Sequence, residues 1–380
     1  MSDPVLADLA RRETEMVEML GRLVSIDSGS YDKAGVDAVG AVLRGFLEAE
    51  GVACRVLPHP TLGDCLIATV GAGRDTALLM GHRDTVFPRG TAAERPFRVA
   101  DGVATGPGVA DMKAGLVMNA FVLAAFARAG TPIPLVGLFT ADEEIGSPSS
   151  RPIIEAEARR AKAVFNAEPG RPSGNVVVRR KGAAFLEVQV TGRAVHSGVE
   201  PQNGASAIEA LARKITRLHA LTDYDAGVTV NVGLVRGGTA VNVVAAEAHA
   251  EVDVRYPTPE AMARVLDEVR AIVDTVEVPG TAARLVERAT FVPLVPTEAS
   301  TRLFDLYTRC AADVGLTVGG EATGGSADSG FAAAVGAPTL CGTGPVGGNP
   351  HRPDEYCRVD TLVPRAQALA LTILRLGRAA

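Results

Sequence analysis

Two short runs of the chain, Thr76–Met80 and Leu135–Thr140, are almost continuously apolar. Strands of this composition occupy the centre of a sheet that is covered on both faces, because neither face can then be exposed to water. A helical pattern over Gly115–Ala129 separates the two runs. The order strand–helix–strand predicts an α/β sheet with helices on its two sides. A further apolar run, Cys65–Val70, is expected to add a strand.

Helical periodicity marks both ends of the chain. Apolar residues at helical spacing over Leu6–Leu23 predict one amphipathic helix, and Gly35–Glu50 predicts a second. The last helix is expected over Val363–Arg378.

The middle of the chain has a different order of elements. From Lys181 to Pro293 the pattern predicts strand, helix, strand, strand, helix and strand, over Ala184–Val190, Ala205–Leu221, Gly227–Val235, Ala246–Tyr256, Pro259–Val276 and Ala283–Thr290. This βαββαβ order is typical of a ferredoxin-like two-layer domain. We therefore expect an α/β domain of residues 1–180 and 294–380 that is interrupted by an inserted ferredoxin-like domain of residues 181–293.

Composition limits the classes of partner. With 380 residues, 47% of them hydrophobic, the chain can form about two domains with proper cores. A net charge of -6 without blocks of like charge argues against a nucleic-acid partner, because phosphate binding needs clustered Lys and Arg. No apolar run approaches the ~20 residues of a membrane span. Together with a charged N-terminal segment and five cysteines without paired spacing, this predicts a cytoplasmic protein with no membrane contact.

His82 and Asp84 follow the first buried strand and are two residues apart. Side chains at this spacing share one face of a strand, so the Asp84 carboxylate can orient the His82 imidazole and raise its basicity. The alternative is a turn or helix-cap aspartate with an incidental histidine.

A glycine-rich segment, Gly106–Gly115, contains Asp111 just ahead of a predicted helix. A carboxylate has two oxygens and can bridge two cations, and Asp111 is well placed to do so. The alternatives are a helix N-cap and a phosphate-binding loop, although neither phosphate-binding pattern is present.

Three acids, Asp142, Glu143 and Glu144, end the second buried strand. Neighbouring carboxylates repel one another, so their placement here requires cations or protons. Because adjacent side chains diverge, Glu144 can bind a metal while Glu143 faces the attacking water as general base. A solvated acidic turn is the alternative.

Glu168 follows another short strand, and His351 lies in a Gly/Pro loop near the C-terminus. Each alone is more typical of a loop residue than of a ligand. Taken with His82, Asp111 and Glu144, they give two imidazoles and three carboxylates, which suit two neighbouring divalent ions, and imidazole favours zinc. Such a pair polarises a carbonyl and lowers the pKa of bound water to about 7. The sequence therefore predicts a metal-dependent hydrolase.

At these residues the chain resembles the co-catalytic zinc metallopeptidase family of glutamate carboxypeptidase (carboxypeptidase G), acetylornithine deacetylase, succinyl-diaminopimelate desuccinylase and aminoacylase. The resemblance runs through essentially the whole chain. It implies that Asp111 bridges two Zn²⁺ per subunit, with Co²⁺ or Mn²⁺ as substitutes. It also implies that His82 and Glu168 complete one metal site, and that Glu144 and His351 complete the other.

The same resemblance implies that Glu143 is the general base and that Asp84 supports His82. The α/β part would be a mixed-sheet zinc-peptidase catalytic domain. The inserted domain would be a lid that also forms a homodimer interface.

Five further residues resemble the family's substrate-binding groups: His196, Asn242, Arg255, Gly324 and Gly325. The resemblance implies that His196 is a lid histidine that reaches the scissile carbonyl across the dimer. It implies that Arg255 holds the substrate's free carboxylate. A surface strand residue is the alternative for Arg255. The two glycines would let the substrate's backbone approach closely.

Local details, including Asp84–Gly90 and Thr323–Asp328, favour the glutamate carboxypeptidase branch. Met112 departs from it, since an acidic residue is common at that position. The expected substrate is a small peptide or an N-acyl amino acid whose hydrolysis releases a C-terminal amino acid, with glutamate as one candidate. The alternatives are a deacylase of an acetylated or succinylated amino-acid intermediate and a non-catalytic metal-binding dimeric scaffold. A serine hydrolase is disfavoured because the chain contains no Gly-x-Ser-x-Gly elbow.

Overall fold

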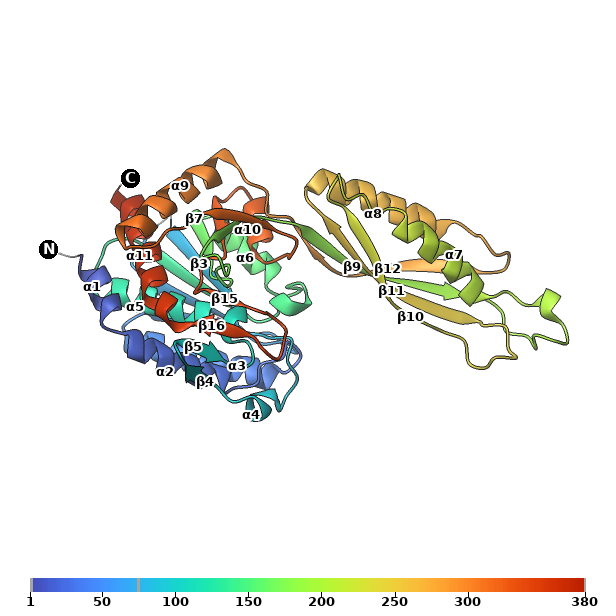
Figure 1. Cartoon of the computed structure of the whole chain (residues 1–380), viewed down its shortest axis with the longest axis horizontal. Coiled ribbons are helices and arrows are strands. Elements are labelled where there is room, and N and C mark those ends of the chain that lie inside the picture. The colour runs from blue at the N-terminus through green and yellow to red at the C-terminus, as the bar shows by residue number, and fades with distance from the viewer. Residues whose placement is uncertain (1–2, 74–75, 379–380) are drawn as a thin grey trace. The chain divides into compact units, whose positions relative to one another are not determined.

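The computed structural model describes residues 3–73 and 76–378 and divides them into two compact units (Figure 1). The first unit is formed within residues 1–179, 296–323 and 331–380. The second unit is formed by residues 180–295 and 324–330. The short segment 324–330 therefore groups with the second unit, although it lies outside the range expected for the inserted domain.

An eight-stranded mixed sheet forms the centre of the first unit, in the order β1-β2-β6-β3-β7-β14-β8-β13. The four inner strands β6, β3, β7 and β14 are parallel to one another, whereas β1, β2 and β8 pair antiparallel with their neighbours. The predicted α/β class is thereby confirmed. The strands span β1 Ala53–Leu57, β2 Cys65–Val70, β3 Thr76–His82, β6 Leu135–Thr140, β7 Ala161–Asn166, β8 Val176–Arg180, β13 Gly320–Thr323 and β14 Thr339–Cys341.

The longest apolar helix, α5, packs against this sheet and is itself covered by α1, α2, α3 and α11. The helical stretch Val109–Arg128, formed by η1 (Val109–Lys113) and α5, is long and apolar enough to cross a membrane. Its most apolar window is 94% buried within the protein, as in the core helix of a globular fold. The main helices of the unit are α1 Pro4–Ala10, α2 Glu13–Val24, α3 Lys33–Ala49, α5 Ala114–Arg128, α6 Arg151–Ala158, α9 Glu298–Asp313 and α11 Leu362–Arg378.

A second, small sheet in the first unit has the order β15-β16-β5-β4. It joins the segment ahead of α5 to the segment ahead of α11. Its strands and the short helical turns of the unit are β4 Arg98–Ala100, β5 Val103–Thr105, β15 Gly347–Gly348, β16 Tyr356–Arg358, α4 Thr91–Glu94, η1 Val109–Lys113, η2 Glu143–Ile145 and η4 Val359–Thr361. The short helix α10, Ser329–Ala334, begins in the segment 324–330 and ends in the first unit.

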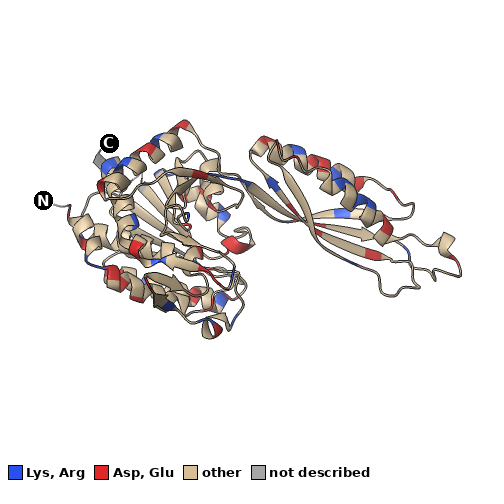
Figure 2. Ribbon diagram, viewed as in Figure 1, with Lys and Arg blue, Asp and Glu red and all other residues tan. Residues whose placement is uncertain are grey.

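The second unit is a four-stranded antiparallel sheet, β10-β11-β9-β12, with α7 and α8 packed on it. The strand–helix–strand–strand–helix–strand order predicted for this segment is confirmed. Leu186, Val188 and Val190 are buried in a core shared with the helices, and the residues between them are more exposed. The elements are β9 Gly182–Thr191, η3 Pro201–Asn203, α7 Ala207–His219, β10 Thr229–Gly237, β11 Glu247–Tyr256, α8 Pro259–Asp274 and β12 Ala282–Phe291. Charges of both signs alternate along α8 (Figure 2).

The prediction of one helix over Leu6–Leu23 is wrong, because the chain forms α1 and α2 with a break at Arg11 and Arg12. Arg12 is buried, and its guanidinium donates to Glu15 at 2.6 Å and to Glu50 of α3 at 2.8 Å. A buried charge must be paired. This ion pair with α3 fixes the position of the break. The spacing of apolar residues cannot predict it, because the partner lies in another helix.

Arg83, between the two site residues His82 and Asp84, is buried and joins three segments of the first unit. Its guanidinium donates to the carbonyl oxygens of Thr140 and Val36, each at 3.2 Å, and to that of Asp64. It therefore holds the end of β6 against β3. Gly40 of α3 makes room for it, because a Cβ at that position would overlap the guanidinium.

Two glycines of α3 give a matched test of this packing. Gly40→Ala should lower the free energy of unfolding by about 1–3 kcal/mol, since the new methyl group meets Arg83. Gly45→Ala, whose Cβ would meet nothing within 4 Å, should raise it by about 0.5–1 kcal/mol through helix propensity. Urea denaturation measures the free energy of unfolding of both variants. Equal values for the two would contradict the conclusion that Gly40 makes room for Arg83.

Candidate metal centre

Three neighbouring parallel strands end beside one another and supply most of the acidic and imidazole groups. His82 is the last residue of β3, Glu143 and Glu144 follow β6, and Glu168 follows β7. The carboxyl ends of parallel strands meet at one edge of a sheet, which is where open α/β sheets place their ligand sites. The order β6-β3-β7 therefore brings these side chains together.

Two loops complete the cluster. Asp111 comes from η1, ahead of α5, and His351 follows β15. A Cβ at Gly115 would overlap the carbonyl of Ala167, so the first turn of α5 lies directly against the segment that carries Glu168.

Asp111 lies between the two imidazoles. Its Oδ1 is 3.2 Å from His82 Nε2, and its Oδ2 is 3.2 Å from His351 Nε2. Glu168 Oε1 lies 3.7 Å from His82 Nε2, and Glu144 Oε2 lies 3.2 Å from His351 Nε2. All five residues predicted from the sequence as ligands are thus gathered in one place. Ligand atoms of His82, Asp111 and Glu144 all lie within 4.8 Å of one another.

Glu143 faces the same space, with its Oε2 4.0 Å from His82 Nε2. Asp111 does not cap α5, and Glu143 does not lie in a solvated turn. The N-cap of α5 is Lys113, and Asp111 contacts histidines instead. Glu143 is buried, so the segment is not a solvated turn.

Asp84 is fully buried and organises the residues around it. Its carbonyl oxygen accepts a hydrogen bond from His82 Nδ1 at 2.9 Å, and its carboxylate lies 3.4 Å from the same nitrogen. The carboxylate also accepts the backbone N–H groups of Glu143 and Glu144, both at 3.1 Å, and the Ser30 hydroxyl at 2.7 Å. Asp84 therefore directs Nε2 of His82 toward Asp111 and ties the acidic segment to β3.

Glu355 is a functional candidate that the sequence did not reveal. Its carboxylate is buried and accepts three backbone N–H groups, those of Gly108 at 3.1 Å, Ala110 at 2.8 Å and Asp111 at 2.9 Å. Burial raises the pKa of Glu355 to about 7, and these bonds oppose the shift. In the sequence, Glu355 is an isolated acid four residues after His351. Nothing in the sequence indicates that it binds a loop more than 240 positions away.

The electrostatics of the cluster favour a bound cation. Burial, with the charge of Asp111, raises the pKa of Glu144 to about 7, while hydrogen bonds to Asp111 and Glu144 raise that of His351 to about 10. Burial alone would raise the pKa of Asp111, but its hydrogen bonds to His351 and His82 hold it well below its ordinary value.

One oxygen of the cluster points to the same conclusion. Among the described residues, Glu144 Oε1 is buried without a hydrogen-bond partner. Buried carboxylate oxygens need a donor or a cation, and the mixture of imidazole and carboxylate donors suits zinc. The residues present therefore fit a divalent metal ion.

The other predicted residues lie in the second unit. His196 and Asn242 are exposed and lie in paired segments, since His196 bridges to Val243 and Ser197 donates its backbone N–H to Asn242 O at 3.0 Å. The segments of His196 and Asn242 lie beyond the Glu247 end of β11. Arg255 is near the other end of that strand, close to the segment 324–330. A Cβ at Gly324 would meet nothing within 4 Å, so no packing within the protein requires a glycine there.

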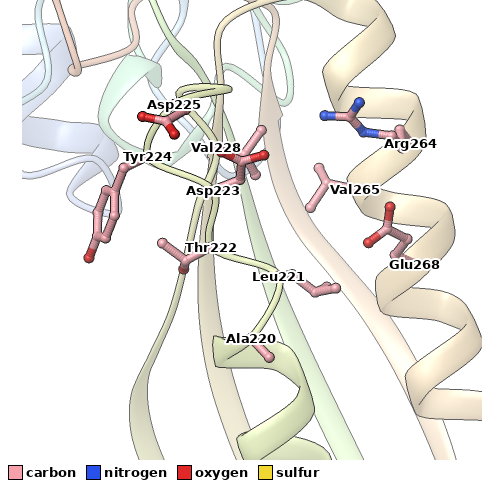
Figure 3. Close-up of a pocket in the computed structure, with 10 residues that line it drawn as sticks. All are labelled: Ala220, Leu221, Thr222, Asp223, Tyr224, Asp225, Val228, Arg264, Val265 and Glu268. Atoms are coloured by element: carbon pink, nitrogen blue, oxygen red, sulfur yellow. The ribbon is translucent and has the colours of Figure 1, made fainter.

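A cavity of about 690 Å³ lies elsewhere in the second unit (Figure 3). It is lined by the loop that follows α7, including Asp223 and Asp225, and by Arg264 and Glu268 of α8. Its lining includes none of the residues predicted for the site.

An α/β sheet that gathers imidazoles and buried carboxylates at the ends of its parallel strands is the arrangement of a metal-dependent hydrolase. Residues 78–375 match the peptidase family M20/M25/M40. The chain belongs to this family of metallopeptidases.

Individual relatives span most of the chain. It is 29% identical to carboxypeptidase G2 of Pseudomonas sp. (strain RS-16), over 99% of this chain and 92% of that protein. It is 35% identical to acetylornithine deacetylase of Myxococcus xanthus, over 66% of this chain and 70% of the relative. Among solved structures, an M20 family metallo-carboxypeptidase from Sulfolobus solfataricus has a TM-score of 0.80 with 18% identity, covering 96% of this chain and 100% of that one. This last likeness supports the fold.

Glu355→Gln should weaken metal binding about 10–100-fold, the usual cost of losing an outer group that orients a ligand. The amide would turn an N–H toward backbone N–H groups, and the segment that carries Asp111 would loosen. Competition with a chelator, followed by metal analysis, measures the affinity. Glu298→Gln, at a position whose side chain is 94% exposed, is the control and should bind metal as the wild type does.

Proposed function

We propose that the protein is a two-zinc amidohydrolase that releases a C-terminal amino acid from an N-acyl amino acid or a small peptide, with glutamate as a candidate product. The observation that carries this proposal is the position of Asp111, whose two oxygens face different imidazoles at 3.2 Å each. Glu168 on one side and Glu144 on the other give each half a second carboxylate. Two neighbouring cation sites with Asp111 between them fit this arrangement, and Co²⁺ or Mn²⁺ would suit the same donors.

Two divalent ions at this place would polarise the scissile carbonyl and lower the pKa of the attacking water. Glu143 is buried beside His82, and no ligand role is needed for it. Its carboxylate can take the proton of the attacking water and pass it to the leaving amine, as a general base and then a general acid. Asp84 keeps the backbone of Glu143 in place through its hydrogen bond at 3.1 Å.

The second unit would supply substrate contacts, and its geometry supports a homodimer. Arg255 and Glu247 are eight residues apart on β11, roughly 27 Å at about 3.4 Å per residue, and the paired segments of His196 and Asn242 lie beyond Glu247. One small substrate cannot touch Arg255 and His196 of the same subunit. If both contact substrate, one of them must come from a partner subunit, and we propose that His196 and Asn242 do.

The edge strand β10 supports the same proposal. Among the described strands it has a neighbour on one side only, and Leu234 and Val235 on it are 50% and 55% exposed. An open edge with apolar side chains is suited to pairing with another chain.

The second candidate is a deacylase of an acetylated or succinylated amino acid, favoured by the 35% identity to an acetylornithine deacetylase. A panel of acetyl, succinyl, benzoyl and peptidyl amino acids separates the two candidates. A deacylase should prefer the acetyl or succinyl substrates, whereas the first candidate should prefer the benzoyl or peptidyl ones. A non-catalytic metal-binding scaffold is disfavoured because Glu143 is present and faces the cluster.

Glu143→Ala should lower turnover by about 10²–10⁴-fold, since general acid–base catalysis contributes that much. Metal content should stay near that of the wild type, because the five proposed ligands are unchanged. Steady-state kinetics and metal analysis on the same samples test both statements. Turnover close to the wild-type value would rule out Glu143 as the base.

Mixed dimers test whether His196 acts across subunits. Glu143→Ala and His196→Ala homodimers should both be nearly inactive. Co-expression of the two should restore about a quarter of wild-type activity, because half of the randomly formed dimers are mixed and each has one site with both residues intact. Activity no higher than that of the two homodimers would contradict the shared site.

A further inference from the structure

One side of the Arg255 guanidinium is already occupied in the second unit. Arg255 Nε donates to Asp253 Oδ1 at 2.7 Å, and Nη2 donates to Asp253 Oδ2 at 2.9 Å. The two residues are two apart on β11 and therefore share a face of the strand. Two parallel bonds between a planar guanidinium and a carboxylate fix the plane of the arginine as well as its position.

The other side of the guanidinium remains available to a ligand. A guanidinium has five N–H donors, and Asp253 uses two of them. Nη1 donates a third bond to the Ser326 hydroxyl at 3.3 Å, which leaves one N–H group on Nη1 and one on Nη2. The Phe185 ring lies beneath the guanidinium, with its centroid 5.3 Å from Cζ. These two N–H groups, next to a hydroxyl, can donate to a second carboxylate while the bonds to Asp253 stay intact.

The hydroxyl beside it is also held in place. The buried Arg180 donates from Nη1 to the carbonyl oxygens of Gly325 and Ser326, both at 3.3 Å. Arg180, Ser326 and Arg255 belong to the same compact unit. The site beside Arg255 is therefore assembled from one strand and one anchored loop within a single unit.

We propose that Asp253 is a positioning residue that makes Arg255 selective for substrates with a free carboxylate. By holding Nε and Nη2, Asp253 presents the opposite side of the guanidinium beside Ser326 to that carboxylate. The inference rests on the proposed function and adds a residue to it.

Two other roles for Asp253 account less well for the geometry. The side chains of Asp253 and Arg255 are 34% and 25% exposed, and ion pairs this open to water add little to stability. Competition of Asp253 with substrate would require both to use the same N–H groups. Asp253 uses Nε and one N–H of Nη2, and it leaves the other N–H of Nη2 and one of Nη1 to the substrate. Positioning and competition predict opposite changes in KM.

The test compares an N-acyl amino acid chosen from the substrate panel with its C-terminal amide. Asp253→Asn should raise KM for the free acid about tenfold, the effect of losing one charge-assisted hydrogen bond. Its kinetics with the amide should not change. In an Arg255→Ala background, Asp253→Asn should have no further effect, because it acts through that arginine.

Asp267→Asn is the matched control, since Asp267 also pairs with an arginine, Arg270 at 2.9 Å, but on an exposed helix face. It should leave both KM values unchanged. An unchanged or lower KM for the free acid in Asp253→Asn would overturn the inference while leaving the proposed function in place. A wild-type enzyme that does not distinguish acid from amide, or that hydrolyses no member of the panel, would overturn the carboxylate-directed function itself and the inference with it.

Discussion

The contact on which the site depends is that of Asp111 with two imidazoles, one at each carboxylate oxygen. It draws together His82 from a central strand and His351 from a loop about 270 positions later, and it leaves Glu144 and Glu168 on either side. Several carboxylates in so little space repel one another, and burial adds to the cost of their charge. The fold can keep them together only if protons or cations offset this repulsion, and Glu144 Oε1, which is buried without a hydrogen-bond partner among the described residues, favours a cation.

The acids beside this contact are held by backbone N–H groups. Asp84 accepts those of Glu143 and Glu144, and Glu355 accepts that of Asp111 together with two of its neighbours. Bonds of this kind satisfy buried carboxylates without using cations, and they fix the backbone from which the ligands project. The site is thus built in two layers, with one set of acids facing the shared space and another fixing the first set to the sheet.

The sequence predicted the facing set, because His82, Glu144 and Glu168 come at the ends of apolar strands, where ligand sites are expected. It could not predict Glu355, Arg83 or Asp253, whose partners are backbone groups or neighbours chosen by tertiary packing. The break between α1 and α2 cannot be predicted for the same reason, since Arg12 is fixed by Glu50 of another helix. The spacing of apolar residues predicts which face of an element is buried. It does not predict which distant residue pairs with a buried charge.

The residues proposed for hydrolysis and those proposed for substrate choice lie in different units of this chain. The cluster around Asp111 belongs to the first unit, whereas Arg255, Ser326, His196 and Asn242 belong to the second. The acids and imidazoles are constrained by burial and by one another, so few substitutions there preserve a metal site. His196 and Asn242 are exposed and have no such constraint, so these positions can vary without disturbing the cluster. Family membership therefore defines the reaction more closely than the substrate.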